Sequence, residues 1–303
     1  MKLRFIIPVS IISCLLAMGF VLSNHNDTTK KYADMVLIKA KNKSFMMGFT
    51  AAEAGIEYAC YVGNHKVNFS YDWYMDSTLV TQADYLALMH KNPSFHKGDL
   101  QLPVEFVSWY DAVLYCNARS KRDKLDTVYV YTKIVTNDTS VQNLTSLSYD
   151  IYKSGYRLPT NAEYEYTERA NLTGRYFFCD TTQNIDSIAN EYAWSKLNSG
   201  MMTHPVKQKK THPWGLYDII GNVFEWTNDW EGRYEDHDVK DPVGPADGNT
   251  ECGTHWVGTP KRMAKGGSLK TDIKGHMRIS YHYKWPPATT SWENGFRCVA
   301  TKK

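Results

Sequence analysis

The chain has 303 residues, of which 43% are hydrophobic, 22% charged and 14% aromatic, a composition that excludes intrinsic disorder, collagen-like repeats and a disulfide-stapled miniprotein. Lysine and arginine total 35 against 32 for aspartate and glutamate, without any block of like charge, so nothing favours nucleic acid as a partner. The chain has 21 Tyr and 9 Trp with a mean hydropathy of -0.48. Much of its apolar surface therefore comes from rings that also carry a polar group.

The N-terminal segment predicts export. Residues 5–22 form an uncharged apolar run that follows two basic residues and precedes a polar stretch, as in a signal sequence over residues 1–23 with a linker over 24–33. Three outcomes stay open: cleavage, retention as a membrane anchor of just sufficient length, or lipidation of Cys14, whose surroundings resemble a bacterial lipobox. Each of them places residues 24–303 in the periplasm or at the cell surface, with any membrane attachment through the N-terminus.

The cysteines of the exported part are widely spaced and lack the paired spacing of a zinc site. Because an exported chain meets oxidising conditions, disulfides are the default interpretation. Five is an odd number, so at least one thiol stays free or pairs between chains. These cysteines are Cys60, Cys116, Cys179, Cys252 and Cys298.

Residues 34–303 contain no repeat, low-complexity segment or flexible linker, so we expect one large domain. Three short helices are predicted by capping boxes, in which a hydroxyl residue stands three positions before a carboxylate. The hydroxyl residues are Thr81, Ser108 and Thr160.

Short alternating segments predict strands, for example over residues 35–38 and 127–131. Residues 132–155 and 231–262 are expected to be polar excursions from the core. The pattern predicts a loop-rich α+β domain.

Several segments, in this order and spacing, resemble the formylglycine-generating enzyme family, also called the sulfatase-modifying-factor domain. Residues 35–38 and 44–48 resemble its opening strands, so the likeness covers the whole domain. The segments are PVEFVSWYDA (103–112), YRLPTNAEYEY (156–166), GLYDIIGNVFEW (215–226), KGGS (265–268) and NGFRC (294–298).

The resemblance implies a C-type-lectin-like fold, with short helices, small antiparallel sheets and structural calcium. In active members two C-terminal cysteines bind copper and use oxygen to convert a sulfatase cysteine to formylglycine. Here the two positions hold Thr271 and His276, and residues 253–297 contain no cysteine. Since Cu(I) prefers thiolate ligands, we expect neither bound copper nor formylglycine-generating activity.

The residues that the family uses for structural calcium and for a disulfide are present in this sequence, unlike its two copper-binding cysteines. The resemblance implies a calcium ion held by the side chains of Asp218 and Glu225 and the carbonyls of Gly221 and Val223, and two carboxylates flanking a Gly-Asn turn suit that ion. A second family calcium site would begin near Asn190. The resemblance also implies a disulfide between Cys116 and Cys298, while the pairing of the other cysteines stays open.

The segment after residue 268 is the candidate binding groove, since the resemblance places it where the family receives its substrate peptide. Rings beside hydroxyl and charged groups suit a protein, peptide or glycan ligand, although several rings could equally pack the loops. On a strand, His276 and His282 would share one face, but two histidines without a carboxylate fall short of the usual metal triad. The groove candidates are Ser268, Tyr281, His282, Tyr283 and Trp285.

Two functional hypotheses follow. The first is an exported, calcium-stabilised binding or scaffold module at the cell envelope that lacks the copper chemistry. The alternative is an oxidoreductase that modifies an exported protein or peptide through a non-copper or otherwise altered metal centre. Whether the chain is an enzyme stays open at this point.

Overall fold

The computed structural model describes residues 31–48, 64–179, 183–232, 237–248 and 259–303. Asp34–Lys303 form one compact unit, and the fold is described for that unit. The apolar N-terminal run, Cys14, Cys60 and Cys252 lie outside the described residues. Among the residues that are described, no helix combines the length and the apolar character needed to cross a bilayer.

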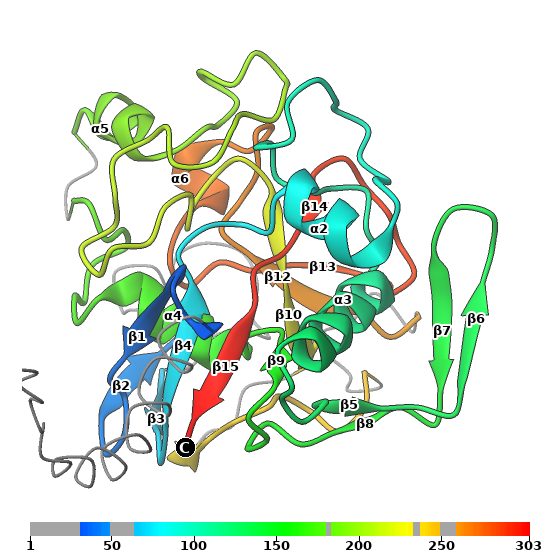
Figure 1. The fold of residues 1–303 in the computed structure, drawn as a ribbon. Helices are drawn as coiled ribbons and strands as arrows, with labels where there is room; N and C mark the ends of the chain where they lie inside the picture. The colour runs from blue at the N-terminus through cyan, green and yellow to red at the C-terminus, as the bar shows by residue number, and fades with distance from the viewer. Residues whose placement is uncertain (1–30, 49–63, 180–182, 233–236, 249–258) are drawn as a thin grey trace, which may run out of the picture. The chain divides into compact units, whose positions relative to one another are not determined.

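The first sheet brings the two ends of the domain together. Its strands pair antiparallel, and the last strand of the chain lies between two earlier ones (Figure 1), so Met75 pairs with Val36 on one side and Val299 on the other. The strand order is β1 (Met35–Ile38), β4 (Asp72–Asp76), β15 (Val299–Lys302) and β9 (Tyr156–Arg157).

The second sheet carries parts of three of the motif segments, 215–226, 265–268 and 294–298. Its strand β10 is buried along most of its length. This strand pairs antiparallel with β12 and parallel with β14. The strand order is β13 (Tyr283–Trp285), β12 (Arg262–Lys265), β10 (Phe224–Trp230) and β14 (Asn294–Gly295).

Three smaller sheets complete the β structure of the described residues. β11 (Val239–Lys240) pairs parallel with β3 (His65–Asn68), which pairs with β2 (Ser44–Met47). The strand expected over 127–131 is only β5 (Tyr129–Val130), paired with β8 (Ser148–Tyr149). The excursion over 132–155 contains a hairpin of β6 (Lys133–Thr136) and β7 (Val141–Thr145), at the right of Figure 1. The expected small antiparallel sheets are thus present, with two parallel pairings besides.

All three predicted capping boxes form, and each starts a helix: α2 (Gln82–Met89), α3 (Trp109–Arg122) and α4 (Asn161–Arg169). In each, the hydroxyl accepts from the N3 backbone and the N3 carboxylate accepts from the cap backbone, which satisfies two otherwise unpaired donors. Two further helices, α5 (Ile185–Tyr192) and α6 (Ile273–His276), were not predicted.

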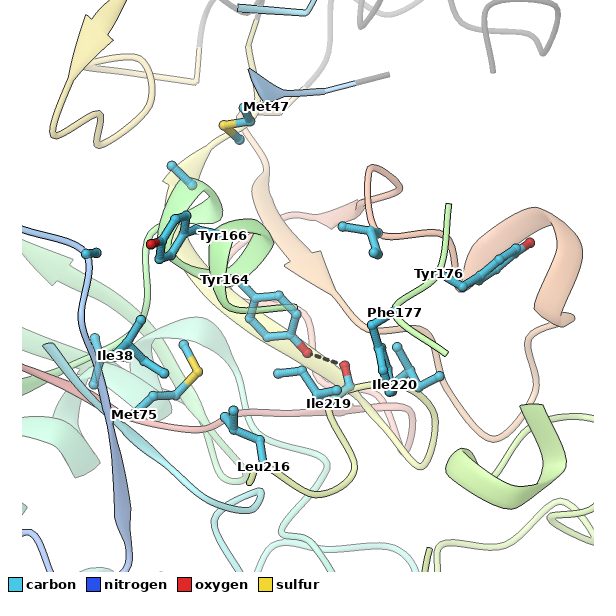
Figure 2. Close-up of a cluster of buried hydrophobic side chains, with 14 of the residues drawn as sticks. Ile38, Met47, Met75, Tyr164, Tyr166, Tyr176, Phe177, Leu216, Ile219 and Ile220 are labelled. Carbon is cyan, nitrogen blue, oxygen red and sulfur yellow. Dashed lines mark hydrogen bonds between the residues drawn. The ribbon is translucent and has the colours of Figure 1, made fainter. Parts of the chain in front are cut away.

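The core between these elements is rich in rings and is shown in Figure 2. Tyr164 is fully buried on α4 and donates its hydroxyl proton to the carbonyl of Ile219 at 2.7 Å. Trp109, Trp226 and Phe224 are also buried, whereas Tyr217 is half-buried. The core therefore contains a large share of the aromatic excess. The indole N–H groups of Trp109 and Trp226 are hydrogen-bonded, whereas Trp73 Nε1 and Tyr85 OH have no hydrogen-bond partner among the described residues.

Candidate functional site

The turn after β12 occupies the first family cysteine position. Ser268 is buried and donates to Glu293 Oε2 at 2.7 Å. Thr271 Oγ1 donates to the Ser268 carbonyl and accepts from the Ser268 N–H, both at 2.9 Å. Gly267 has φ +76°, and a Cβ there would lie 2.9 Å from Thr271 Oγ1. Both hydroxyls are therefore used to hold a tight turn.

The second family cysteine position lies at the end of α6. Asp272 begins this helix by accepting from the Gly275 N–H at 2.6 Å, and its other oxygen lies 2.7 Å from His276 Nδ1. The His276 ring packs edge-on against Tyr281, with the centroids 5.0 Å apart. The imidazole is thus half exposed and already paired with a carboxylate of its own helix.

The interpretation that placed His276 and His282 on one face of a strand is wrong. His276 belongs to a helix because Asp272 supplies an N-cap, whereas His282 precedes β13 and is buried. Burial lowers the pKa of His282 to about 3, with Lys265 and Lys284 adding repulsion. This ring is therefore neutral at physiological pH.

The aromatic groove candidates on β13 pack against other rings of the domain. On β13, Trp285 contacts Phe224 and Trp226, with centroid distances of 5.1 and 5.7 Å. Tyr283 lies against Trp285 at 4.2 Å and keeps part of its surface in solvent. Both rings thus pack against aromatic side chains of β10, which is a structural role.

Sequence reasoning missed a neighbouring apolar surface, which we call the apolar face. Three loops bring it together: the Val206 N–H donates to the Gln101 carbonyl at 3.1 Å, and Ser199 Oγ donates to the Leu269 carbonyl at 2.7 Å. Its solvent-exposed members are Phe95 (68% exposed), Leu100, Leu197, Met201 and Met202 (55%).

The apolar face adjoins the predicted groove through Trp292. This ring lies 6.2 Å from Phe95 and 5.2 Å from the buried ring of His96. Lys270 Nζ lies 4.6 Å above the Trp292 ring and 3.2 Å from Glu293 Oε1. The only signal in the sequence is the presence of Phe95, Met201 and Met202 inside otherwise polar loops, where no packing pattern requires them.

The two carboxylates predicted to bind calcium differ in how free they are to bind an ion. Asp218 is buried; its Oδ2 accepts from the Lys207 N–H at 2.9 Å, while Oδ1 accepts no hydrogen bond from the described residues. Burial raises the pKa of Asp218. Glu225 is already engaged, because Arg297 donates to it from Nε at 2.6 Å and Nη2 at 2.8 Å. Asp218 therefore fits an ion better than Glu225 does, and calcium here stays a prediction.

The second calcium position fits poorly. Lys209 Nζ donates to the Asn190 carbonyl at 2.6 Å and lies 3.8 Å above the Trp194 ring. An ammonium bound to that carbonyl repels a divalent cation. Across the described residues, no group of three or more His, Cys, Asp or Glu side chains is arranged to hold a metal ion.

The structure brings Cys116 and Cys298 together. Their sulfur atoms are 3.7 Å apart in the core, between α3 and the segment that enters β15. Burial and the neighbouring Cys116 raise the pKa of the Cys298 thiol. The covalent disulfide stays a prediction.

Comparison with known proteins identifies the family and agrees with this fold. The sulfatase-modifying factor enzyme 1-like domain matches residues 22–302, so the chain belongs to that family. The "Chaperone protein LppX" of Paenibacillus barcinonensis is 31% identical over 248 residues, which cover 76% of this chain and 81% of the relative.

The formylglycine-generating enzyme of Mus musculus is 29% identical over 65% of this chain, but the match spans only 44% of the enzyme. Among solved structures, Treponema denticola variable protein 1 is 28% identical, with a TM-score of 0.71 over 88% of this chain and 95% of its own. PvdO from Pseudomonas aeruginosa shares the fold, with a TM-score of 0.61 and 20% identity over 88% of this chain and 94% of its own. The predicted family and fold are thus confirmed.

Proposed function

We propose that this chain is an exported member of the family without formylglycine-generating activity, and that it binds extended segments of other exported proteins on its apolar face. The observation that carries this proposal is the exposure of Phe95, Met201 and Met202 directly beside the loop where the family places its reactive residues. Large apolar side chains exposed together are a feature of interaction surfaces.

The residues at the two cysteine positions support the absence of copper chemistry. Thr271 uses its hydroxyl to close the turn at Ser268, and His276 is paired with Asp272. Neither supplies a thiolate, the ligand type that holds Cu(I). The half-exposed imidazole and the hydroxyl therefore serve local structure in this proposal.

The chemistry of the apolar face suits an unfolded polypeptide. Methionine side chains are unbranched and polarizable, so they adapt to different apolar partners. Trp292 and Phe95 add rigid contact area, and Lys270 supplies a polar contact at the rim. The name of the LppX relative, a chaperone protein, agrees with such a ligand, and the apolar run at residues 5–22 agrees with export.

A binding experiment tests the proposal. The purified full chain is titrated into fluorescently labelled, reduced and carboxymethylated α-lactalbumin, which stays unfolded, and anisotropy is measured. We expect a Kd on the order of micromolar, raised about tenfold or more by Phe95→Ser with Met202→Ser, because each loses a buried contact in the complex.

The matched control removes two exposed apolar residues elsewhere. Ile134 and Val135 lie on β6 and are 43% and 39% exposed, so Ile134→Ser with Val135→Ser should leave the Kd unchanged. An equal rise in Kd for both double variants, or no binding by the native chain, would refute the proposal.

A second experiment addresses the copper chemistry. The native chain should bind no stoichiometric Cu(I) and consume no oxygen with a cysteine peptide. The double change Thr271→Cys and His276→Cys should create Cu(I) binding if only the ligands differ from active members. Oxygen uptake by the native chain with such a peptide would instead favour the oxidoreductase alternative.

A further inference from the structure

A cavity of about 520 Å³ lies among β2, β3, α4, β10, β11 and β12. None of its described lining residues belongs to the apolar face or to the turn at Ser268. Its volume falls within the usual range for small-molecule sites, roughly 300–1,000 Å³. Met47, Trp230 and Met263 supply apolar wall, and Figure 2 shows Met47 at the edge of the core cluster.

One carboxyl group in this cavity, that of Asp229, forms no ion pair with the described residues. Asp229 is only 4% exposed, and its Oδ2 accepts from the Asn161 N–H at 2.9 Å, at the start of α4. No described residue donates a hydrogen bond to Oδ1 or forms an ion pair with Asp229, although Arg262 and Arg157 attract the carboxylate from farther away. A buried carboxylate without a cation is costly, so its retention beside a cavity needs a reason beyond one helix-capping bond.

The cationic side chain on the neighbouring strand is directed elsewhere. Arg262 donates from Nη1 to the Asn228 carbonyl at 2.6 Å. Its guanidinium lies 3.9 Å from the Trp109 ring centroid and 3.5 Å from that of Trp230. Arg262 thus stacks between two rings and leaves Asp229 unpaired.

The opposite side of the Asp229 carboxyl group is formed by backbone. Gly244 has φ +76°, and a Cβ there would lie 3.1 Å from Asp229 Oδ1 and 2.8 Å from Asp229 Cβ. A glycine at this point keeps space beside Oδ1 that any side chain would fill.

The other acids of the cavity are already satisfied. Asp241 accepts from the Ser70 N–H at 2.8 Å, from Ser70 Oγ at 2.5 Å and from the Tyr152 hydroxyl at 3.1 Å. Asp238 is exposed and lies 3.9 Å from Lys66 Nζ. Among the described residues, Asp229 is therefore the buried acid in this cavity with the fewest direct partners, since it has one hydrogen bond and no ion pair.

We propose that this cavity binds an organic amine, whose ammonium group pairs with Asp229 while its apolar body packs against Met47, Trp230 and Met263. The geometry suits one charged end and a body the size of an aromatic ring. Both a free small amine and the N-terminus of a polypeptide have this chemistry. The site is separate from the apolar face, so either proposal can fail without the other.

Binding should be coupled to a proton. Burial raises the pKa of Asp229 to about 7, with repulsion from Glu163 in the same direction and Arg262 and Arg157 opposing it. An ammonium ligand favours the ionised carboxylate, so affinity should rise about tenfold between pH 6 and pH 8. The other titratable groups lining the cavity are His65, His237, Asp238, Lys240 and Asp241.

Calorimetry on the full chain tests the proposal with matched probes. 2-Phenylethylamine should bind, and 2-phenylethanol, which has the same body without the charge, should bind about tenfold more weakly or not at all. Phe-Gly-Gly amide with a free or an acetylated N-terminus forms the second arm. Tighter binding of the free peptide than of 2-phenylethylamine would identify a polypeptide N-terminus as the source, and the reverse would identify a free amine.

Three variants link the binding to the cavity. Asp229→Asn should weaken amine binding about tenfold or more. It should also remove the part of the pH dependence that Asp229 causes, while any contribution from the five other titratable groups of the cavity remains. Gly244→Ala should weaken binding by filling the space at Oδ1. Asp126→Asn, at an exposed acid paired with Lys303, should change nothing.

Thermal unfolding of Asp229→Asn shows whether the variant is folded. Weaker binding can be assigned to the lost carboxylate only if the variant still melts cooperatively. If it does not, Gly244→Ala carries the comparison. Equal binding of amine and alcohol, no binding of any amine, or unchanged affinity in both cavity variants would overturn the proposal.

Discussion

The ammonium of Lys209 is bound to the carbonyl oxygen of Asn190, with Nζ and O 2.6 Å apart. This contact lies where the family resemblance would begin a second calcium site. The Asn190 side-chain oxygen is buried beside it and accepts no hydrogen bond from the described residues. A resident side-chain cation thus stands where a bound cation was expected.

Replacing the ammonium by a carboxylate should reverse this arrangement. Lys209→Asp removes the positive charge and adds an oxygen ligand near Asn190, so the variant should bind one more calcium ion per chain than the native protein. Equilibrium dialysis measures the difference. The melting temperature of Lys209→Asp should fall in EDTA and recover with calcium, because an ion that binds only the folded state stabilises that state. The control Lys209→Met should melt lower than the native chain but respond to calcium no more than the native chain does, and equal stoichiometry in all three would contradict the interpretation.

The ion pair between Arg297 and Glu225 should be a major contributor to stability. Both groups are fully buried, and Arg297 also donates to the carbonyls of Asp76, Tyr217 and Asp218. Arg297→Met leaves the Glu225 charge buried, which should cost about 3–5 kcal/mol of unfolding free energy. Denaturant titration measures this loss. Arg122→Met, at an exposed pair with Asp123, should cost less than about 1 kcal/mol; comparable losses would argue against the special role of Arg297.

Glu168 predicts a pH-dependent stability. Burial raises its pKa to about 8, and Glu165 adds repulsion while Lys265 opposes the rise. Between its ordinary value of 4.5 and about 8, the folded chain keeps a proton that the unfolded chain loses. The stability contributed by this group is therefore full below pH 4.5 and is lost as the pH rises through 8.

Glu168→Gln lacks this titration. Its melting temperature relative to the native chain should rise between pH 5 and pH 8.5, by several degrees, in scanning calorimetry. Glu191→Gln, at an exposed glutamate of α5 paired with Lys210, should show a constant difference. A constant difference for Glu168→Gln as well would show that its carboxyl is ionised in the folded protein.

Cys116 and Cys298 are expected to form a disulfide in oxidising conditions. Peptide mapping without reductant should find the two cysteines linked, and reduction should lower the unfolding free energy by about 2–4 kcal/mol, since the bridge closes a long loop. Cys116→Ala should abolish both effects. Recovery of alkylated Cys116 from unreduced, denatured protein would show that the core holds two thiols instead.

Local signals predicted much of the fold, and distant contacts explain the rest. The capping boxes at Thr81, Ser108 and Thr160 depend on residues three positions apart, so they could be recognised in the sequence. α5 begins at Asn184 in a left-handed conformation without a side-chain cap, so no such signal existed. The Lys209–Asn190 contact spans 19 positions, and the described walls of the Asp229 cavity come from six separate helices and strands. No local pattern encodes either of them.

The position of β15 has a consequence for the timing of folding. This strand is the last of the chain, yet it supplies the hydrogen bonds that join β4 to β9. Without residues 299–302, the edges of both strands stay unpaired and the segment that brings Cys298 to Cys116 is not anchored. Native structure therefore cannot be completed until residues 299–302 have emerged from the ribosome, and a chain truncated after residue 297 should be degraded readily in limited proteolysis. The sheet of β1, β4, β15 and β9 thus stays incomplete until its last strand has been made.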